Sequence, residues 1–366
     1  MPKNLFVTSI FFLISYFLWG LVPYFESLCE KVGSLAIVII RFGASSVLLF
    51  SLLLAHLLFK KDFWMKNGGI IKFSTEKLQF KIMRREVAMP RLVIYSSLGI
   101  LFIVALDFFF LMMQAFRTAL AIGVTLSLGL PPVATALFEV VFGRFKESSN
   151  IWRFAVGVIA AIAGIGAAMC SLQPAVGEIQ TDLIGYLWVF GFVITWSVWL
   201  IIKSRETQLW SDTTEEGWFI KEVWKLFIIF SAGSAFNVLL LAFVSKLEAQ
   251  SVLKYFLFIF EYSFGSTSFS PKNFIALSMM VLVSTFFAYL ALFWAFAKSS
   301  KLNALSILAV VLQTFEPLTV LLFNVFVWHQ TLTNLMILGI GLVLISMGAI
   351  LIVSQKLDKD KNLSYR

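Results

Sequence analysis

The sequence predicts an all-α polytopic membrane protein with ten transmembrane helices, arranged as two inverted five-helix repeats. The first reason is composition, because 60% of the residues are hydrophobic and only 13% are charged, whereas about a quarter of the residues of a soluble domain are charged. The second is the length of the apolar runs, about 20 residues each, which an α-helix needs to cross a hydrocarbon core of roughly 30 Å. The third is a motif that recurs in both halves of the chain.

Ten apolar runs with polar ends are long enough to be spans. They cover approximately residues 7–28, 34–58, 92–114, 119–142, 153–172, 183–202, 224–244, 274–297, 303–327 and 334–354. A further apolar stretch at 251–264 is short and is interrupted by Lys254 and Glu261. We expect it to form an outer interfacial helix or lid, because an eleventh span would move the basic tail to the outside.

The basic residues follow one side of the membrane. If the N-terminus is cytoplasmic, the segments on that side contain 23 of the 29 Lys and Arg residues, the outer segments contain five, and Arg41 lies inside a span. Cytoplasmic loops carry such an excess of positive charge. The sequence therefore predicts a multi-pass protein of the cell (inner) membrane with both termini in the cytoplasm.

The loop at residues 60–91 interleaves nine basic residues with aromatic ones. In a soluble chain this pattern could bind nucleic acid. Beside a membrane, however, such a segment is attracted to anionic lipid headgroups by about 1 kcal/mol per basic residue. We therefore predict membrane lipids as partners of this loop, expect no nucleic acid, and leave the oligomeric state open.

An internal repeat divides the chain. Ala119 stands thirteen residues before Pro132, and Ala304 stands at the same distance before Pro317, with a leucine after each alanine. Because each half then holds an odd number of spans, the second half is inserted upside down relative to the first, as in many secondary transporters. The predicted units are the first repeat at 1–173, the second repeat at 174–356 and a cytoplasmic basic tail at 357–366.

The span at 303–327 carries Glu316, followed by Pro317, close to its middle. A charge at the bilayer centre costs at least about 2.5 kcal/mol, so this carboxylate should be protonated, paired or turned towards a polar cavity. The proline removes a backbone donor beside it. We regard Glu316 as a functional-site candidate, with a structural, hydrogen-bonded glutamic acid as the alternative; Gln313 shares its helix face.

Two further charges lie inside predicted spans. Arg41 and Asp107 each stand seven or eight residues from the outer end of a span, which places both at a depth of roughly 10 to 12 Å. Their equal depth predicts an ion pair between them. The sequence leaves open whether this pair is a gate, a substrate anchor or a structural staple, and Gln114 is a nearby polar candidate.

Aromatic residues are candidates for lining a cavity, although most rings in so aromatic a chain face lipid or pack helices. The residues that we predict to bind substrate or ion are Glu316, Gln313, Arg41, Asp107, Trp19, Trp196, Tyr289 and Gln114. Glycines within the spans are expected to permit close helix contact rather than to bind a ligand; these are Gly99, Gly123, Gly129, Gly157, Gly164, Gly166, Gly341 and Gly348.

These features resemble the drug/metabolite transporter (DMT) superfamily, and within it the EamA-type ten-helix transporters. The residues that carry the resemblance are Trp19-Gly20, Arg41-Phe42, Pro132, Gly185, Trp196-Ser197 and Phe315-Glu316-Pro317. The resemblance covers nearly all spans and implies a secondary carrier. The chain departs from the family at Gly143-Arg144 and His329-Gln330, where the family usually has Gly-Glu.

No Walker, dinucleotide or zinc motif is present, and the chain contains only two histidines. We therefore expect no cofactor, no metal and no enzymatic activity. The predicted function is secondary active transport of a small metabolite or amphipathic solute, such as an amino acid, a nucleotide-like metabolite or a drug, by alternating access, with proton coupling or exchange as the drive. Glu316 is the best proton-coupling candidate. The alternatives are a membrane-embedded lipid-modifying enzyme and a non-transporting membrane scaffold.

Overall fold

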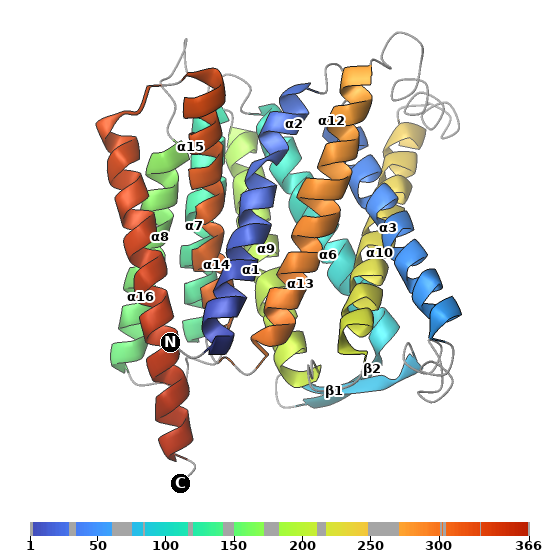
Figure 1. The fold of residues 1–366 in the computed structure, drawn as a ribbon, viewed down its shortest axis with the longest axis horizontal. Coiled ribbons are helices and arrows are strands. Elements are labelled where there is room, and N and C mark those ends of the chain that lie inside the picture. Colours follow the sequence, from blue (N-terminus) through green and yellow to red (C-terminus); the bar gives the residue numbers. More distant parts are fainter. Residues whose placement is uncertain are drawn as a thin grey trace.

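The computed structural model shows helices standing side by side in a bundle, with a two-stranded hairpin at one end (Figure 1). The residues that the structure describes are 3–28, 34–60, 75–82, 85–115, 120–141, 150–171, 183–210, 217–247, 271–300, 302, 305–329 and 331–364.

The elements follow the order of the apolar runs. The first half contains α1 (Lys3–Gly20), α2 (Val22–Leu28), α3 (Ser34–Phe59), β1 (Lys77–Ile82), β2 (Arg85–Pro90), α6 (Arg91–Ala115), α7 (Leu120–Val141) and α8 (Asn150–Ser171). The second half contains α9 (Leu183–Trp210), α10 (Trp218–Leu247), α12 (Pro271–Val281), the π-helix η2 (Leu282–Phe287), α13 (Ala288–Lys298), α14 (Leu305–Gln313), α15 (Phe315–Trp328) and α16 (Asn334–Ser364).

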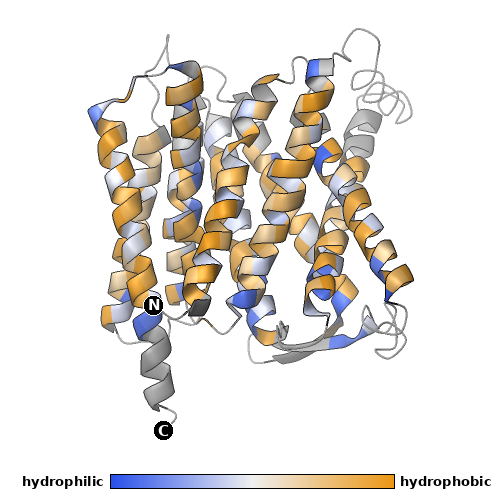
Figure 2. Cartoon of the chain, in the orientation of Figure 1, coloured by the Kyte–Doolittle hydropathy of each residue, from blue (hydrophilic) through white to orange (hydrophobic). Residues whose placement is uncertain are grey.

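The outside of the bundle is apolar. Eight of the described helical stretches are long and apolar enough to cross a membrane, and two shorter apolar helices, Leu5–Gly20 and Leu126–Val141, stand beside them. Large side chains point outwards, with Phe59 85% exposed and Phe326 74% exposed. Figure 2 shows that hydrophobic residues make up most of the length of the helices. Such a surface suits hydrocarbon, where helices satisfy their own backbone groups. The predicted all-α polytopic membrane fold is therefore confirmed.

Helices α9 and α10 are longer than the spans that we predicted. The span expected at 183–202 continues as α9 to Trp210, and the span expected at 224–244 already begins at Trp218 as α10. The prediction was wrong here because it ended each span at its first charged residues. In the folded chain these charges are buried against one another and do not mark the helix ends.

The predicted basic loop at 60–91 contains regular structure. Strands β1 and β2 pair antiparallel, with Lys77 opposite Pro90, and β2 leads directly into α6. The Arg91 guanidinium forms an ion pair with the Glu76 carboxylate at 3.1 Å. The hairpin is thus joined to α6 without a linker, and this ion pair ties the first residue of α6 to the residue before β1.

The start of α1 and the end of α16 lie towards the same end of the bundle, and the β1–β2 hairpin is also at that end (Figure 1). Helix α16 continues to Ser364, well into the predicted tail at 357–366. The predicted lid at 251–264 lies outside the described residues, as does the side chain of Gln114.

Glycines hold several helix pairs together at close distance. A Cβ added to Gly99 on α6 would lie 2.2 Å from the Ile229 carbonyl oxygen on α10, and one added to Gly233 on α10 would lie 2.8 Å from the Gly99 carbonyl oxygen. Gly129 and Gly164 make a similar contact between α7 and α8. The expectation of close contact is thus confirmed at these sites and at Gly166, which meets α16. It is wrong for three glycines whose Cβ would meet open space, namely Gly157, Gly341 and Gly348.

We predict that Gly99→Ala destabilises the protein, because its methyl group would overlap the backbone of α10 and force the two helices apart. Overpacking of this kind costs about 1–3 kcal/mol or more. Gly43→Ala is the matched control, since a Cβ there meets nothing within 4 Å. Thermal unfolding of the two variants in detergent should show a clear loss for Gly99→Ala and none for Gly43→Ala. Equal transition temperatures would contradict the packing role of Gly99.

Candidate functional site

Two helices are interrupted along their length. Helix α1 ends at Gly20, and α2 begins after Leu21. Helix α14 ends at Gln313, and α15 begins after Thr314. Each new helix carries a proline in its first turn, where the missing N–H is tolerated but where a helix arriving from the preceding residues cannot continue regularly. The tertiary fold thus has two discontinuous helices that the apolar runs presented as continuous spans.

The two interruptions lie against each other. A Cβ on Gly20 would lie 2.5 Å from the Thr319 Cβ and 3.1 Å from the Glu316 carbonyl oxygen. At the second interruption, the Thr314 N–H and hydroxyl both donate to the Val311 carbonyl, at 3.2 and 2.6 Å. Glycine is therefore required at position 20 so that the α1–α2 junction can touch the start of α15, next to Glu316.

A third irregular segment faces the same region. The π-helix η2 separates α12 from α13, and its Thr285 hydroxyl donates to the Met280 carbonyl at 3.0 Å. The same hydroxyl accepts a 2.9 Å hydrogen bond from Arg41 Nε on α3, and Arg41 also approaches the Ser284 carbonyl at 3.5 Å. Single π-turns inside α-helices occur frequently at functional sites. Here the π-turn provides the acceptors that fix the guanidinium within the bundle.

Glu316 is connected to this region by hydrogen bonding and by charge. Its carboxylate is hydrogen-bonded to the Gln313 side chain and interacts electrostatically with Arg41. Gln313 Oε1 in turn accepts a 2.8 Å hydrogen bond from Trp196 Nε1 on α9, so the amide nitrogen of Gln313 is the group that donates to Glu316. The Tyr289 hydroxyl also lies within the electrostatic range of Glu316. The Glu316 carboxylate at the start of α15 and the Arg41 guanidinium of α3 therefore attract each other electrostatically.

Aromatic rings surround these polar groups. The Trp19 ring centroid lies 4.8 Å from that of Tyr289 and 5.8 Å from that of Trp196. Phe102 lies 5.3 Å from Tyr289 and 6.0 Å from Trp196. We call Trp19, Phe102, Trp196 and Tyr289 the aromatic cluster. Its members come from α1, α6, α9 and α13, so the cluster joins both halves of the chain.

Six of the eight predicted site residues thus come together in the structure. They are Glu316, Gln313, Arg41, Trp19, Trp196 and Tyr289. The sequence analysis missed Thr285, whose position in a π-turn no local pattern indicated. It also missed Tyr16, whose hydroxyl donates to the Ala309 carbonyl of α14 at 2.9 Å. We use the name central site for the six residues together with Tyr16 and Thr285.

Asp107 lies apart from the central site. Its Oδ1 accepts a 3.1 Å hydrogen bond from Asn237 Nδ2 on α10, and its Oδ2 has no hydrogen-bond partner. The predicted ion pair between Arg41 and Asp107 is therefore wrong among the described side chains. The prediction used only the position of each residue along its helix, which does not determine towards which neighbour the side chain is rotated.

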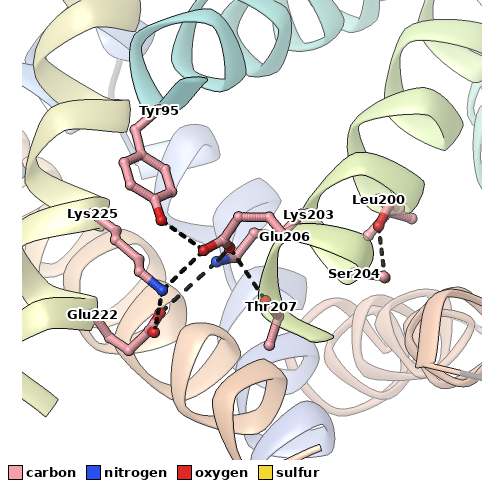
Figure 3. A network of polar contacts seen from close by, with 8 residues as sticks. All are labelled: Tyr95, Leu200, Lys203, Ser204, Glu206, Thr207, Glu222 and Lys225. Carbon is pink, nitrogen blue, oxygen red and sulfur yellow. Dashed lines mark hydrogen bonds and ion pairs between the residues drawn. The ribbon is translucent and has the colours of Figure 1, made fainter. Parts of the chain in front are cut away.

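Figure 3 shows a second polar centre, which lies where α9 ends and α10 begins. These two helix ends lie at the hairpin end of the bundle (Figure 1). We call Lys203, Glu206, Glu222 and Lys225 the charge quartet. Glu206 binds Lys203 at 2.6 Å and Lys225 at 2.9 Å, Glu222 binds Lys225 at 2.6 Å, and Lys203 lies 3.8 Å from Glu222. The Tyr95 hydroxyl of α6 donates to Glu206 at 2.7 Å. The quartet has no net charge and links α9 to α10, and the Tyr95 hydrogen bond attaches α6 to it.

The sequence contained a signal for the quartet that we did not use. Lys203 and Glu206 are three residues apart on α9, and Glu222 and Lys225 are three apart on α10 in the opposite order. Pairs with this spacing share a helix face, and two such pairs of opposite order can neutralise each other across an interface. None of the four residues is more than 5% exposed, and the Lys203 ammonium also lies 4.2 Å from the Phe293 ring centroid on α13.

Comparison with known proteins adds information on the fold. No protein-family model matches the chain, and no curated protein sequence matches it. Among solved structures, 26 chains match. One of them, described as "Crystal structure of protein", is 14% identical, with a TM-score of 0.62, and the match covers 95% of this chain and 98% of that one. At this level of identity the likeness concerns the fold alone, and it extends over nearly the whole length of both chains.

We predict that Lys203→Met strongly destabilises the protein, because it leaves two buried carboxylates with a single cation. Breaking a buried pair in this way costs about 3–5 kcal/mol. The double variant Lys203→Met/Glu206→Gln removes one charge of each sign and leaves Lys225 paired with Glu222, so it should recover most of the loss. Thermal unfolding in detergent measures both effects. A double variant as unstable as the sum of the two single variants would contradict mutual neutralisation in the quartet.

Proposed function

We propose that the protein is a secondary transporter and that the central site binds its solute. The observation that carries this proposal is the meeting of two discontinuous helices and a π-turn around Glu316 and Arg41. Irregular backbone at membrane depth is tolerated only where it is buried in protein or lines a polar cavity. In many secondary carriers, substrate and ion sites are built from discontinuous helices near the membrane midplane.

The pattern of helix contacts supports two inverted repeats, here 1–173 and 174–356. Helix α1 packs on α13, and the corresponding helices of the other half, α9 and α6, pack on each other. Helix α7 packs on α9. In the other half, the span that corresponds to α7 is α14 and α15, and it packs on α1, which corresponds to α9. The pairs α8 with α16 and α3 with α10 join the halves. Exchanging the halves maps these contacts onto one another, as expected for ten spans of the EamA type.

The chemistry of the central site favours a small solute with both polar and apolar parts. Glu316 offers a negative charge, Arg41 a positive charge, and the aromatic cluster offers flat apolar faces that can also bind a cation. Trp196 and Gln313 connect the cluster to the carboxylate. A metabolite or amphipathic compound with a charged group and an apolar or planar part fits this combination, which includes amino acids, nucleotide-like metabolites and drugs.

Alternating access requires that one end of the bundle is closed while the other is open. The charge quartet fastens α6, α9 and α10 to one another near the hairpin end, so it acts as the closure of that end. The position of both termini at this end supports a common side for them, which we propose to be the cytoplasm on the basis of the basic residues. The hairpin region would then face the anionic lipid surface.

The transport proposal is tested by reconstitution. The purified protein is placed in liposomes, and the uptake of a labelled panel that includes amino acids and S-adenosylmethionine is followed with and without an imposed pH gradient. Saturable uptake above that of protein-free liposomes supports a carrier. Absence of uptake for the whole panel, together with chemical change of the liposome lipids, would instead favour a lipid-modifying enzyme.

We predict that Glu316→Gln abolishes the acceleration of uptake by the pH gradient, because the amide keeps the shape of the carboxylate but can neither bind nor release a proton. Exchange between labelled and unlabelled solute on the two sides should persist, since it needs no net proton movement. Both are measured in the same liposomes. An undiminished response to the gradient in Glu316→Gln would remove Glu316 from the coupling mechanism.

We also predict that Trp196→Phe lowers uptake about tenfold, because the buried Gln313 oxygen loses its donor at a cost of about 1–3 kcal/mol. Trp199→Phe is the matched control. This neighbouring ring is equally buried and is stacked on Trp196 at 5.2 Å, but its Nε1 has no hydrogen-bond partner among the described residues. Initial uptake rates of both variants are compared with the unmodified protein. Equal loss in both would point to packing rather than to the hydrogen bond.

A further inference from the structure

A carboxyl and a carboxamide face each other between α6 and α10, away from the central site. Asp107 is 6% exposed and Asn237 is 1% exposed. Asn237 Nδ2 donates to Asp107 Oδ1 at 3.1 Å. The other oxygen of each group, Asp107 Oδ2 and Asn237 Oδ1, is buried without a hydrogen-bond partner. Each unpaired buried oxygen costs about 1–3 kcal/mol, so the pair is incomplete as it stands.

The packing of α6 on α10 fixes this pair. Gly99 meets Ile229, and four residues further along each helix Ile103 meets Gly233. A further four residues along, the same register brings Asp107 opposite Asn237. The two helices run in the same direction, and the glycine contacts hold them at close distance. Both polar side chains are consequently directed into a tight interface and cannot turn towards water.

No described cation balances Asp107. Its partner in the described part of the chain is Asn237 alone. The charged groups described on the neighbouring helices are bonded to other residues. On α3, Arg41 is bonded to Thr285. On α7, Glu139 accepts a 2.7 Å hydrogen bond from Ser306 of α14. The charges of α9 begin at Lys203 near the hairpin end; Glu222 and Lys225 of α10 are in the quartet there, and Arg91 of α6 is bonded to Glu76.

We propose that Asp107 and Asn237 form a proton-binding site. A proton on Asp107 Oδ2 can be donated to Asn237 Oδ1, so that one proton satisfies both unpartnered oxygens and makes the pair neutral. The proton comes from water on one side of the membrane and returns to water on the other, and no covalent bond between heavy atoms changes. In hydrocarbon surroundings a neutral acid is far less costly than an isolated carboxylate.

A metal cation fits this place less well. Hard cations such as Ca²⁺ take about six to eight oxygen ligands, and Mg²⁺ demands a near-ideal octahedron. The described residues offer two unpartnered oxygens from the pair, plus the Ser234 hydroxyl one turn before Asn237, which also lacks a partner. A proton needs only one donor position and one acceptor, which the pair supplies completely.

The role of this proton rests on the proposed transport function, although its binding does not. Asp107 would be a second titrating carboxyl besides Glu316, and it lies on a different helix pair. Loading the proton completes the hydrogen bonding between α6 and α10, while releasing it leaves a buried charge that favours opening of this interface to water. Because α6 also carries Phe102 of the aromatic cluster, proton loading would change the position of one wall of the central site.

Infrared difference spectroscopy tests the site without any solute. The purified protein in lipid nanodiscs is compared at mildly acidic and mildly alkaline pH, and the carbonyl stretching band of protonated carboxylic acids is recorded. We expect Asp107→Asn to remove one component of this band. Asn237→Leu should keep that component but shift it to higher frequency, because the acceptor for the acid proton is lost. Glu316→Gln, the control, should leave this component unchanged.

Two results would overturn the proposal. The first is an acid band that is the same in Asp107→Asn as in the unmodified protein, which would mean that Asp107 stays ionised. The second, which does not depend on the folding of Asp107→Asn, is an acid band that Asn237→Leu leaves unshifted. Since no transport is measured, either failure leaves the proposed carrier function untouched, and failed uptake in liposomes would not affect the infrared result.

Discussion

The structure depends on one constraint, which is that hydrocarbon offers no hydrogen-bond partner to the backbone. A helix can therefore be interrupted inside the membrane only where the chain itself takes over the freed groups. The interruptions after Gly20 and Gln313 meet this condition by packing against each other, with Thr314 closing its own turn through Val311. The position of the central site follows from that meeting point, because broken helices, a π-turn and ionisable side chains coincide there.

Three groups of buried charges are accommodated in different ways. The charge quartet neutralises itself within two pairs of opposite order and is further bonded by Tyr95. Glu316 and Arg41 act on each other but are bonded directly to neutral partners, Gln313 and Thr285. Asp107 is bonded, among the described residues, to the Asn237 amide alone. The first arrangement suits a closure, since each of its charges is paired with an opposite charge, whereas the other two leave bonding capacity for a solute or a proton.

The aromatic cluster explains how the site can be shared by distant segments of the chain. Its rings come from four helices of both halves and approach to between 4.8 and 6.0 Å of one another. Flat rings bury a large area while keeping few rotatable bonds. A change in the angle between the halves would therefore alter the whole cluster at once, which connects the proposed alternating access to the geometry around Glu316.

The sequence alone determined what depends on local composition: the membrane class, the apolar helices, the Glu316-Pro317 pair inside a span and six residues of the central site. These are readable because hydropathy and the cost of a buried charge apply to each segment separately. The tertiary structure decided the pairing. Arg41 binds Thr285 rather than Asp107, Lys203 lies inside the bundle rather than in a loop, and some glycines touch a neighbour while others do not. Which side chains pair depends on the rotation of each helix about its axis and on which helix packs beside it. The hydropathy of a single span determines neither.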